Sequence, residues 1–222
     1  PLDVSLSSEV LPEIQEFERT ATTAINAYVR PKVERYLGRM EDALRSDGYA
    51  RPLFLMQSGG GVIAAPAARA APVRLAESGP VGGALAARML AEAAGYSDAI
   101  AFDMGGTTAK TCLIADCEMP VTRTYAVDRV HRFKRGSGTP IAVPTVDLIE
   151  IGAGGGSYAR VDTLGLIQIG PESAAADPGP ACYGRGGTRA TVTDANVLLG
   201  YLDPADFLAG AMQLDIKATE EA

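Results

Sequence analysis

The residues that could do chemistry are concentrated in one short segment, Asp103-Met104-Gly105-Gly106-Thr107-Thr108. An apolar run, residues 99–102, brings the Asp103 carboxylate to the end of an expected strand. Two glycines permit a tight turn whose backbone N–H groups can approach a ligand, and two hydroxyls follow. Phosphate is bound by neutral donors in a concave turn with a metal-holding carboxylate nearby, so the segment predicts a phosphate site. From spacing alone, an ordinary β-hairpin with a Gly-Gly turn explains the same residues about as well.

The sequence lacks two common nucleotide-binding motifs. It contains no Gly-Lys-Ser/Thr, so it has no P-loop. The second glycine-rich segment, Gly152-Ala153-Gly154-Gly155-Gly156-Ser157, has Ser157 where a dinucleotide fingerprint has its third glycine. This segment follows an expected strand and has almost no side chains, which suits close approach of a nucleotide or substrate. A flexible turn or bulge is the alternative.

Three further positions have both a functional and a structural interpretation. Asp194 precedes an expected helix, where a carboxylate can cap the helix or face a metal or nucleotide. Residues 78–83 (SGPVGG) open a helix whose free N–H groups could bind an anion, although close packing with a cap explains them as well. Asp147 lies in an apolar strand, where a buried carboxylate needs a partner, and both interpretations remain open.

Other catalytic classes are disfavoured. His131 is the single histidine, and no G-x-S-x-G serine is present to pair with it. Cys112 and Cys117 do not have the spacing of a zinc knuckle. Cys182 has no neighbour in sequence that would activate it as a nucleophile. The basic cluster Arg129 to Arg135 is most simply a solvated surface.

The elements that position these segments are mixed helices and strands, which predicts an α/β or α+β fold. We expect helices at 11–44, 64–71, 84–94 and 195–199, and strands at 52–56, 99–102, 109–115 and 146–151. In the first helix Ser7 and Ser8 are cap candidates, and Pro12 suits the first turn. The apolar residues that fall near helical spacing in it are Ile14, Phe17, Ala21, Ala24, Ile25 and Tyr28. Pro31 is expected to break or restart this helix.

Composition excludes several classes of protein. The chain has 222 residues, of which 47% are hydrophobic and 21% charged, so it can bury a core. No apolar run reaches the roughly 18 residues of a membrane span. Twenty basic against 27 acidic residues give a net charge of −7, which is unlike a nucleic-acid-binding protein. Three cysteines and no signal peptide at the start of the sequence lead us to expect a cytoplasmic protein.

Short segments spread over nearly the whole chain carry one further indication. They are VSLS (4–7), EVLPEI (9–14), ERT (18–20), NAY (26–28), QSGG (57–60), ESGPVGG (77–83), FDMGGTT (102–108), IGAGGGS (151–157), GPES (170–173), DPGPACYG (177–184) and TVTDA (191–195). In combination they resemble the A-type subunit of the hydantoinase/oxoprolinase family. That family includes ATP-dependent N-methylhydantoinases, 5-oxoprolinases and subunits of acetone- and acetophenone-type carboxylases.

The resemblance implies an α/β, actin/sugar-kinase/Hsp70-like nucleotide-binding lobe related to ribonuclease H, with ATP and Mg²⁺ as cofactors. It implies that the phosphates are gripped by Gly105, Gly106, Thr107 and Thr108. Asp103 would hold Mg²⁺ through water or orient the attacking group, and Asp194 would be a second catalytic carboxylate near the metal. A nucleotide or substrate pocket would be lined by Gly154, Gly155, Gly156 and Ser157. Where the family usually has serine or threonine-aspartate after Gly-Gly-Thr, this sequence has Thr108-Ala109-Lys110. Lys110 would either add charge near phosphate or point outward.

The resemblance also implies a function. ATP would phosphorylate the oxygen of an amide or carbonyl, after which water opens a cyclic amide of the hydantoin or 5-oxoproline type. An ATP-dependent ketone carboxylase subunit and a non-catalytic nucleotide-binding or subunit-docking module are the alternatives. The expected partners are a small-molecule cyclic amide or ketone and a companion B-type subunit in an oligomer, with no nucleic acid and no membrane. Residues 1–222 are expected to be an internal fragment of the family domain that lacks the first phosphate region and the C-terminal portion, and to be inactive in isolation.

Overall fold

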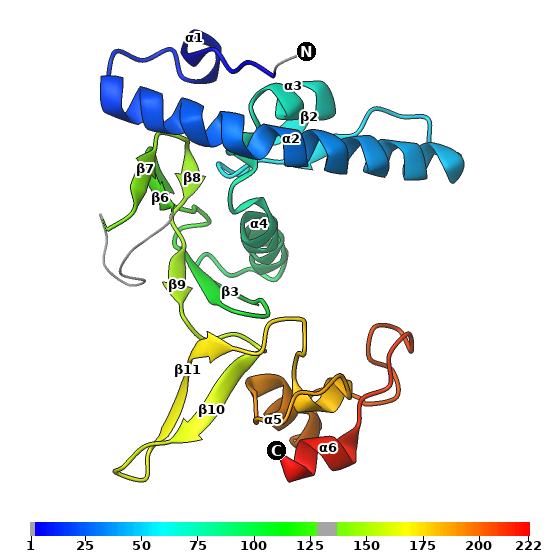
Figure 1. Ribbon diagram of the computed structural model, residues 1–222. Helices are drawn as coiled ribbons and strands as arrows, with labels where there is room; N and C mark the ends of the chain where they lie inside the picture. The colour runs from blue at the N-terminus through cyan, green and yellow to red at the C-terminus, as the bar shows by residue number, and fades with distance from the viewer. Residues whose placement is uncertain (1–2, 128–136) are drawn as a thin grey trace. The chain divides into compact units, whose positions relative to one another are not determined.

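The computed structural model describes residues 3–127 and 137–222, which form two compact units (Figure 1). Unit 1 consists of residues 1–101 and 112–148, and unit 2 of residues 102–111 and 149–222. The chain passes between the units three times: within strand β3 (Ala99–Met104), within strand β4 (Ala109–Ile114), and after residue 148. His131 and the basic cluster Arg129 to Arg135 lie outside the described residues.

Unit 1 is built along one long helix, α2 (Glu16–Ser46), against which α1 (Ser7–Val10) and α3 (Ala65–Ala70) pack (Figure 1). The predicted long helix is confirmed, but it begins at Glu16, so Pro12 precedes it and Ser7 and Ser8 belong to α1. Pro31 does not break α2. Proline inside a helix costs about 3 kcal/mol, and packing on both sides of Pro31 offsets this, because Asn26 and Leu37 are fully buried.

The apolar residues predicted for the first helix are only partly buried: Ile25 packs against the core cluster of Val10, Val73, Ile141 and Val143. Ile14 is 97% exposed, and Phe17 and Tyr28 are also exposed. The polar residue Asn26 is fully buried instead. Its side-chain amide donates to the Ser5 hydroxyl (3.2 Å) and to the Ala70 carbonyl (3.1 Å). Its carbonyl oxygen accepts from the Val73 N–H at 3.2 Å. Polar side chains therefore fix α2 in unit 1, which a search for apolar periodicity does not detect.

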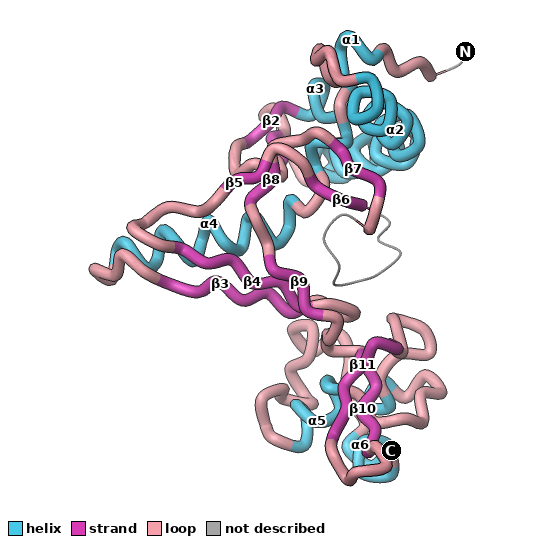
Figure 2. The backbone as a smooth tube through the Cα atoms, turned by 90° about the vertical axis from the view of Figure 1, so that its left-hand side faces the viewer, coloured by secondary structure: helices cyan, strands magenta, loops and turns pink. Residues whose placement is uncertain are grey.

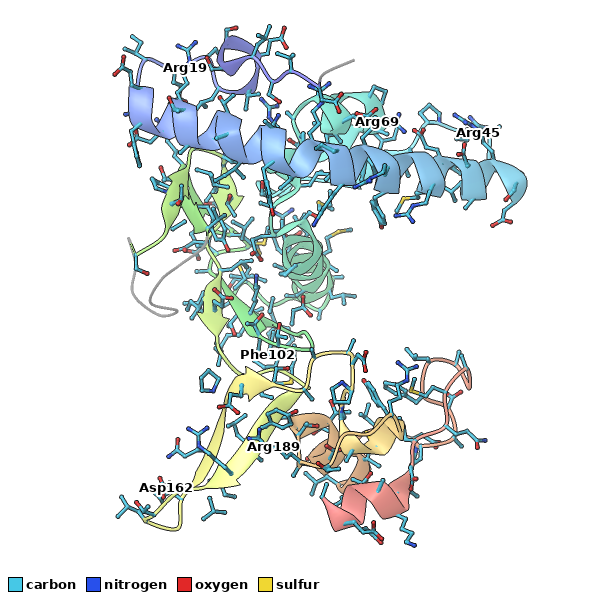
Figure 3. The ribbon with its side chains drawn as sticks, viewed as in Figure 1. Arg19, Arg45, Arg69, Phe102, Asp162 and Arg189 are labelled. Carbon is cyan, nitrogen blue, oxygen red and sulfur yellow. The ribbon has the colours of Figure 1, made fainter. Side chains whose placement is uncertain are left out.

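The rest of unit 1 consists of short antiparallel strand pairs and one further long helix. The pairs are β1 (Phe54–Met56) with β2 (Val62–Ala64), β5 (Val121–Thr122) with β8 (Thr145–Val146), and β6 (Tyr125–Val127) with β7 (Thr139–Ile141). Helix α4 (Ser78–Ala93) buries Val81 and Ala84 against Cys112, Ile114 and Val146. A 3₁₀ turn, η1 (Pro72–Leu75), follows α3, whose Arg69 pairs with Glu41 of α2 at 2.8 Å (Figure 3).

Unit 2 combines strands and short helices (Figure 2). They are β9 (Ile149–Ile151), β10 (Ser157–Val161), β11 (Ile167–Ser173), η2 (Ala181–Tyr183), α5 (Val192–Leu198) and α6 (Ile216–Glu221). Strand β9 pairs antiparallel with β4 in the sheet β3-β4-β9, and β10 pairs with β11. The turn between β10 and β11 is closed by Asp162 (Figure 3). Its carboxylate accepts from the Leu166 N–H, the Gln168 side-chain amide and the Leu164 N–H, and these bonds lower its pKa.

The mixture of helices and strands confirms the α/β prediction. The expected strand at 146–151 is two strands, β8 and β9, because Asp147 between them donates its N–H to the Pro120 carbonyl at 2.8 Å. Unit 2 has its own core, in which Cys182, Val197 and Leu214 are buried. No helix among the described residues is both long and apolar enough to cross a bilayer.

Candidate functional site

The predicted phosphate segment is the turn that joins β3 to β4, and it lies entirely in unit 2. The Gly105 N–H donates to the Thr108 carbonyl at 2.9 Å and closes the turn. Residues 103–107 are exposed, and Thr108 is half-buried. A β-hairpin is therefore present, and its tip faces solvent, as a phosphate-binding turn requires.

A glycine-rich loop, residues 154–157, holds the backbone of this turn. The Gly155 N–H donates to the Gly105 carbonyl at 2.9 Å, and the Gly156 N–H donates to the Gly106 carbonyl at 2.7 Å. Each carbonyl shares a trans peptide with the N–H of the following residue, which points in the opposite direction. The N–H groups of Gly106 and Thr107 therefore point away from the loop.

These two N–H groups are open on the side that faces away from the loop. No described residue accepts a hydrogen bond from either of them. A Cβ added at Gly106 would meet no atom within 4 Å, so the turn is not covered there. Two neighbouring, unpaired amides of fixed orientation form a ready-made anion-binding feature.

The glycines of the loop are required by the contact with the turn. A Cβ at Gly154 would lie 2.6 Å from backbone atoms of Gly105, Thr107 and Thr108. A Cβ at Gly156 would lie 3.0 Å from the Gly106 carbonyl oxygen. The loop thus packs backbone against backbone behind the hairpin, which only glycine allows. That the same residues also line a nucleotide or substrate pocket stays a prediction.

Two hydroxyl groups fix the loop in turn. The Ser157 hydroxyl is fully buried and accepts from the Gly154 N–H at 2.9 Å. The Thr193 hydroxyl donates to the Gly155 carbonyl at 2.8 Å, and the Thr193 N–H donates to the same oxygen at 2.7 Å. Thr193 was not among the residues expected from the sequence. It is nevertheless the link between helix α5 and the loop behind the hairpin.

Asp194 is 2% exposed and is held by backbone donors. Its carboxylate accepts from the N–H groups of Ala181 (3.3 Å), Cys182 (2.8 Å) and Thr191 (2.8 Å), and from the Thr191 hydroxyl (2.7 Å). Thr191 is the N-cap of α5 and Asp194 completes its capping box, a role that the Thr-x-x-Asp spacing signals. As arranged, this carboxylate has no free position that would fit a metal ion. The catalytic and metal roles of Asp194 stay predictions.

Cys182 lies against this carboxylate and is fully buried. Burial raises the pKa of its thiol to about 12, and a hydrogen bond to the Asp194 carboxylate and the negative charge of that group add to the rise. Because the thiolate is the reactive form, the geometry agrees with the sequence in disfavouring Cys182 as a nucleophile.

Asp103 is the acidic group nearest to the open amides along the chain, two residues before Gly105, and its side chain is exposed. The described residues contain no group of three or more His, Cys, Asp and Glu side chains that could hold a metal ion. Mg²⁺ usually keeps several waters and takes one or two carboxylates together with substrate phosphates, so a single exposed aspartate fits this ion.

Lys110 lies opposite Glu150 in the β4–β9 register, a cross-strand pair of opposite charge.

Two other candidate positions belong to unit 1. Residues 78–83 form the first turns of α4, whose N-cap Glu77 has a φ of 60°. Asp147 is half-buried, and its charge adds to burial in raising the pKa of the Cys112 thiol.

A family model described as Hydantoinase/oxoprolinase matches residues 19–222. The chain belongs to the hydantoinase/oxoprolinase family. Among similar family members is an uncharacterized protein of Methanocaldococcus jannaschii, which is 45% identical over 90% of the chain and 30% of that protein. The caprolactamase alpha subunit of Pseudomonas jessenii is 37% identical over 96% of the chain and 30% of that subunit.

Two solved structures resemble this family member in fold. One is a nucleotide-free structure of acetone carboxylase, an enzyme described there as performing ATP-dependent acetone carboxylation. The TM-score is 0.75 and the identity 29%, and the match covers 96% of the present chain and 29% of the acetone carboxylase chain. The other is the ATP-dependent caprolactamase of Pseudomonas jessenii, with a TM-score of 0.63 at 34% identity over 96% of the chain and 30% of that chain. The chain thus spans about 30% of the length of these hydantoinase/oxoprolinase relatives.

Proposed function

We propose that the hairpin between β3 and β4 binds the phosphates of ATP–Mg²⁺ within an enzyme that activates a cyclic amide by phosphorylation and hydrolyses it. The observation that carries the proposal is the pair of open N–H groups at Gly106 and Thr107, aimed away from the loop by two short hydrogen bonds. The ATP-dependence stated for the two solved relatives supports ATP as the source of the phosphate.

Each residue of the hairpin has a distinct part in this proposal. The N–H groups of Gly106 and Thr107 bind phosphate oxygens, and the exposed Thr107 hydroxyl is a third donor. Asp103 faces Mg²⁺ through water, and the ion, when bound, neutralises charge on the phosphates. The loop at 154–157 fixes the donors before the ligand arrives, so that no reorganisation is needed during the reaction.

The proposed reaction makes an inert amide reactive. The amide oxygen takes the terminal phosphoryl group, which makes the adjacent carbon more electrophilic. ADP leaves in this transfer. Water then adds to that carbon, the C–N bond breaks as the nitrogen takes a proton, and the ring opens to an acyl phosphate. A second water hydrolyses the acyl phosphate to carboxylate and inorganic phosphate. The relatives are about three times as long as this chain, and we propose that catalysis needs segments of the kind they carry, together with a companion B-type subunit.

A ketone carboxylase subunit is the second candidate, because the acetone carboxylase structure is a close match in fold, with a TM-score of 0.75. Both candidates use the hairpin in the same way and differ in what accepts the phosphoryl group. ADP formation by the complete enzyme separates them: cyclic amides such as caprolactam, hydantoin or 5-oxoproline should stimulate it in the first case, and acetone with bicarbonate in the second.

The phosphate site itself is tested by calorimetric titration of the 222-residue chain with ATP–Mg²⁺. Gly106→Ala places a methyl group on the open side of the turn, where no protein atom lies within 4 Å. We expect this variant to fold like the wild type and to bind ATP at least about tenfold more weakly, since the methyl group occupies phosphate space. Gly83→Ala in α4, which also meets no atom within 4 Å, is the matched control. Unchanged ATP binding by Gly106→Ala refutes the proposed site.

Asp103→Asn tests the metal-facing role in the same titration. The side chain is exposed and receives no hydrogen bond from the described residues, so the substitution should leave the fold intact. We expect the dependence of ATP affinity on Mg²⁺ concentration to weaken, because the carboxylate that faces the ion is lost. An unaltered Mg²⁺ dependence contradicts the role given to Asp103.

A further inference from the structure

Unit 1 contains a cavity of about 790 Å³ that the phosphate hairpin does not explain. One of its walls is formed by Gln57, Ser58, Gly59 and Gly61 of the glycine-rich segment 57–61, which follows β1. Pockets for small molecules typically have volumes of about 300–1,000 Å³, so the cavity is large enough for a ligand of metabolite size.

The cavity is positively charged in a chain whose net charge is −7. Two arginines, Arg74 and Arg123, line it, against one acidic side chain, Glu13. Both arginines are exposed, and neither forms an ion pair or a side-chain hydrogen bond with any described residue. Arginine binds carboxylate in a bidentate geometry, and an unpaired guanidinium group in a cavity is available for that contact.

The wall next to Arg74 is fixed before any ligand binds. Ser58 is fully buried, and both its N–H (2.9 Å) and its hydroxyl (2.8 Å) donate to the Arg74 carbonyl. Gly59 packs on Pro144, whose carbonyl oxygen would lie 3.2 Å from an added Cβ, and Gly60 has a φ of +88°, a conformation that favours glycine. Within the described chain, the Gly59 N–H has no acceptor, which adds a backbone donor to the cavity wall.

The remaining lining is largely apolar. Val10, Leu11, Val73 and Val143 contribute to it, and Val10, Val73 and Val143 are also members of one core cluster of unit 1. An inorganic anion would leave this surface without a partner, whereas an organic molecule would cover it. The combination of apolar side chains with a few convergent cationic groups is typical of sites for organic anions.

We propose that this cavity binds a small organic carboxylate, with Arg74 and Arg123 holding the carboxylate and the apolar wall holding the rest of the molecule. The site shares no residue with the β3–β4 hairpin and does not depend on the function proposed for it. It assigns a role to the Gln57–Gly61 motif, which the hairpin leaves without one.

The test is calorimetric titration of the 222-residue chain with hippurate, which joins a carboxylate to an amide and an aromatic ring. Hippuramide is the uncharged probe of the same shape, and inorganic phosphate is the probe without an apolar part. The variants are Arg74→Gln and Arg123→Gln, with Arg39→Gln, an exposed arginine of α2 outside the cavity lining, as the matched control. A thermal melt of each variant confirms that it folds.

We expect hippurate to bind at least about tenfold more tightly than hippuramide or phosphate, since the charged contact and the apolar contact are each lost in one of the probes. Arg74→Gln and Arg123→Gln should each weaken hippurate binding about tenfold, and Arg39→Gln should leave it unchanged. Glu13→Gln removes the one acidic group of the lining and should tighten binding severalfold. Equal binding of hippurate and hippuramide, tighter binding of phosphate, or equal affinities of all three arginine variants would each overturn the proposal.

Discussion

Gly154 is the position where one methyl group should do most damage to the hairpin. An added Cβ would lie 2.6 Å from three backbone atoms of residues 105–108, whereas ordinary contact begins at 3.4 Å. The loop and the hairpin must therefore separate by about 0.8 Å, because backbone atoms have no side-chain rotation with which to escape. This shift lengthens the 2.7 and 2.9 Å hydrogen bonds to the Gly105 and Gly106 carbonyls to roughly 3.5–3.7 Å, beyond a useful hydrogen bond.

The magnitude follows from these two effects. Overpacking costs about 1–3 kcal/mol, and two weakened hydrogen bonds cost about 0.5–1.5 kcal/mol each. Gly154→Ala should therefore lower the free energy of unfolding by about 2–6 kcal/mol, measured by urea denaturation. Gly106→Ala is the control, since it meets no atom and should stay within about 0.5 kcal/mol of the wild type. If Gly154→Ala unfolds at the same urea concentration as that control, the loop does not support the hairpin as described.

Three further substitutions test the contacts around the site and in unit 1. Asp194→Asn should lower the free energy of unfolding by about 2–4 kcal/mol in urea, because the amide group faces N–H donors that need an acceptor; a change below about 0.5 kcal/mol contradicts the anchoring role. The pKa of Cys182 is raised from 9.0 to about 12, so the native thiol keeps its proton while the unfolded thiol ionises. Stability should thus fall as pH rises from 9 to 12, and Cys182→Ala should make this fall shallower in urea titrations at several pH values; identical slopes contradict the assignment. Asn26→Ala should lower the melting temperature of unit 1 through loss of three hydrogen bonds, at a cost of about 2–3 kcal/mol, with the exposed Tyr28→Ala as the unaffected comparison.

Local patterns in the sequence were sufficient to place the turn of the hairpin. An apolar run followed by Asp-Met-Gly-Gly predicts a strand that ends in a tight turn, and β3 with Gly105 and Gly106 has this form. Helix α3 and strands β1 and β4 also lie where composition predicts them. Such features depend on neighbours a few residues apart, which the sequence displays directly.

The partner of the turn was not predictable in the same way. Gly154 contacts Gly105 across about fifty positions of sequence, and a run of glycines looks the same whether it lines a ligand or packs on another backbone. Pro31 shows the same limitation, because its effect on α2 is decided by residues that pack against the helix from elsewhere in unit 1. Asp194 is the intermediate case: Thr191, three positions before it, signals the capping box, but the contacts with Ala181 and Cys182 arise only in the fold.

The threefold passage of the chain between its units has a practical consequence for dissecting the gene. Neither unit is one uninterrupted stretch of sequence, since unit 1 resumes at residue 112 after unit 2 has contributed residues 102–111. A clone that stops at residue 101 would lack Ile141, Val143 and Val146, which complete the cores of unit 1. Such a cut would therefore divide the cores of unit 1 between two products, whereas joining residues 101 and 112 through a short glycine linker, with an end at residue 148, would keep every core residue of unit 1 in one polypeptide.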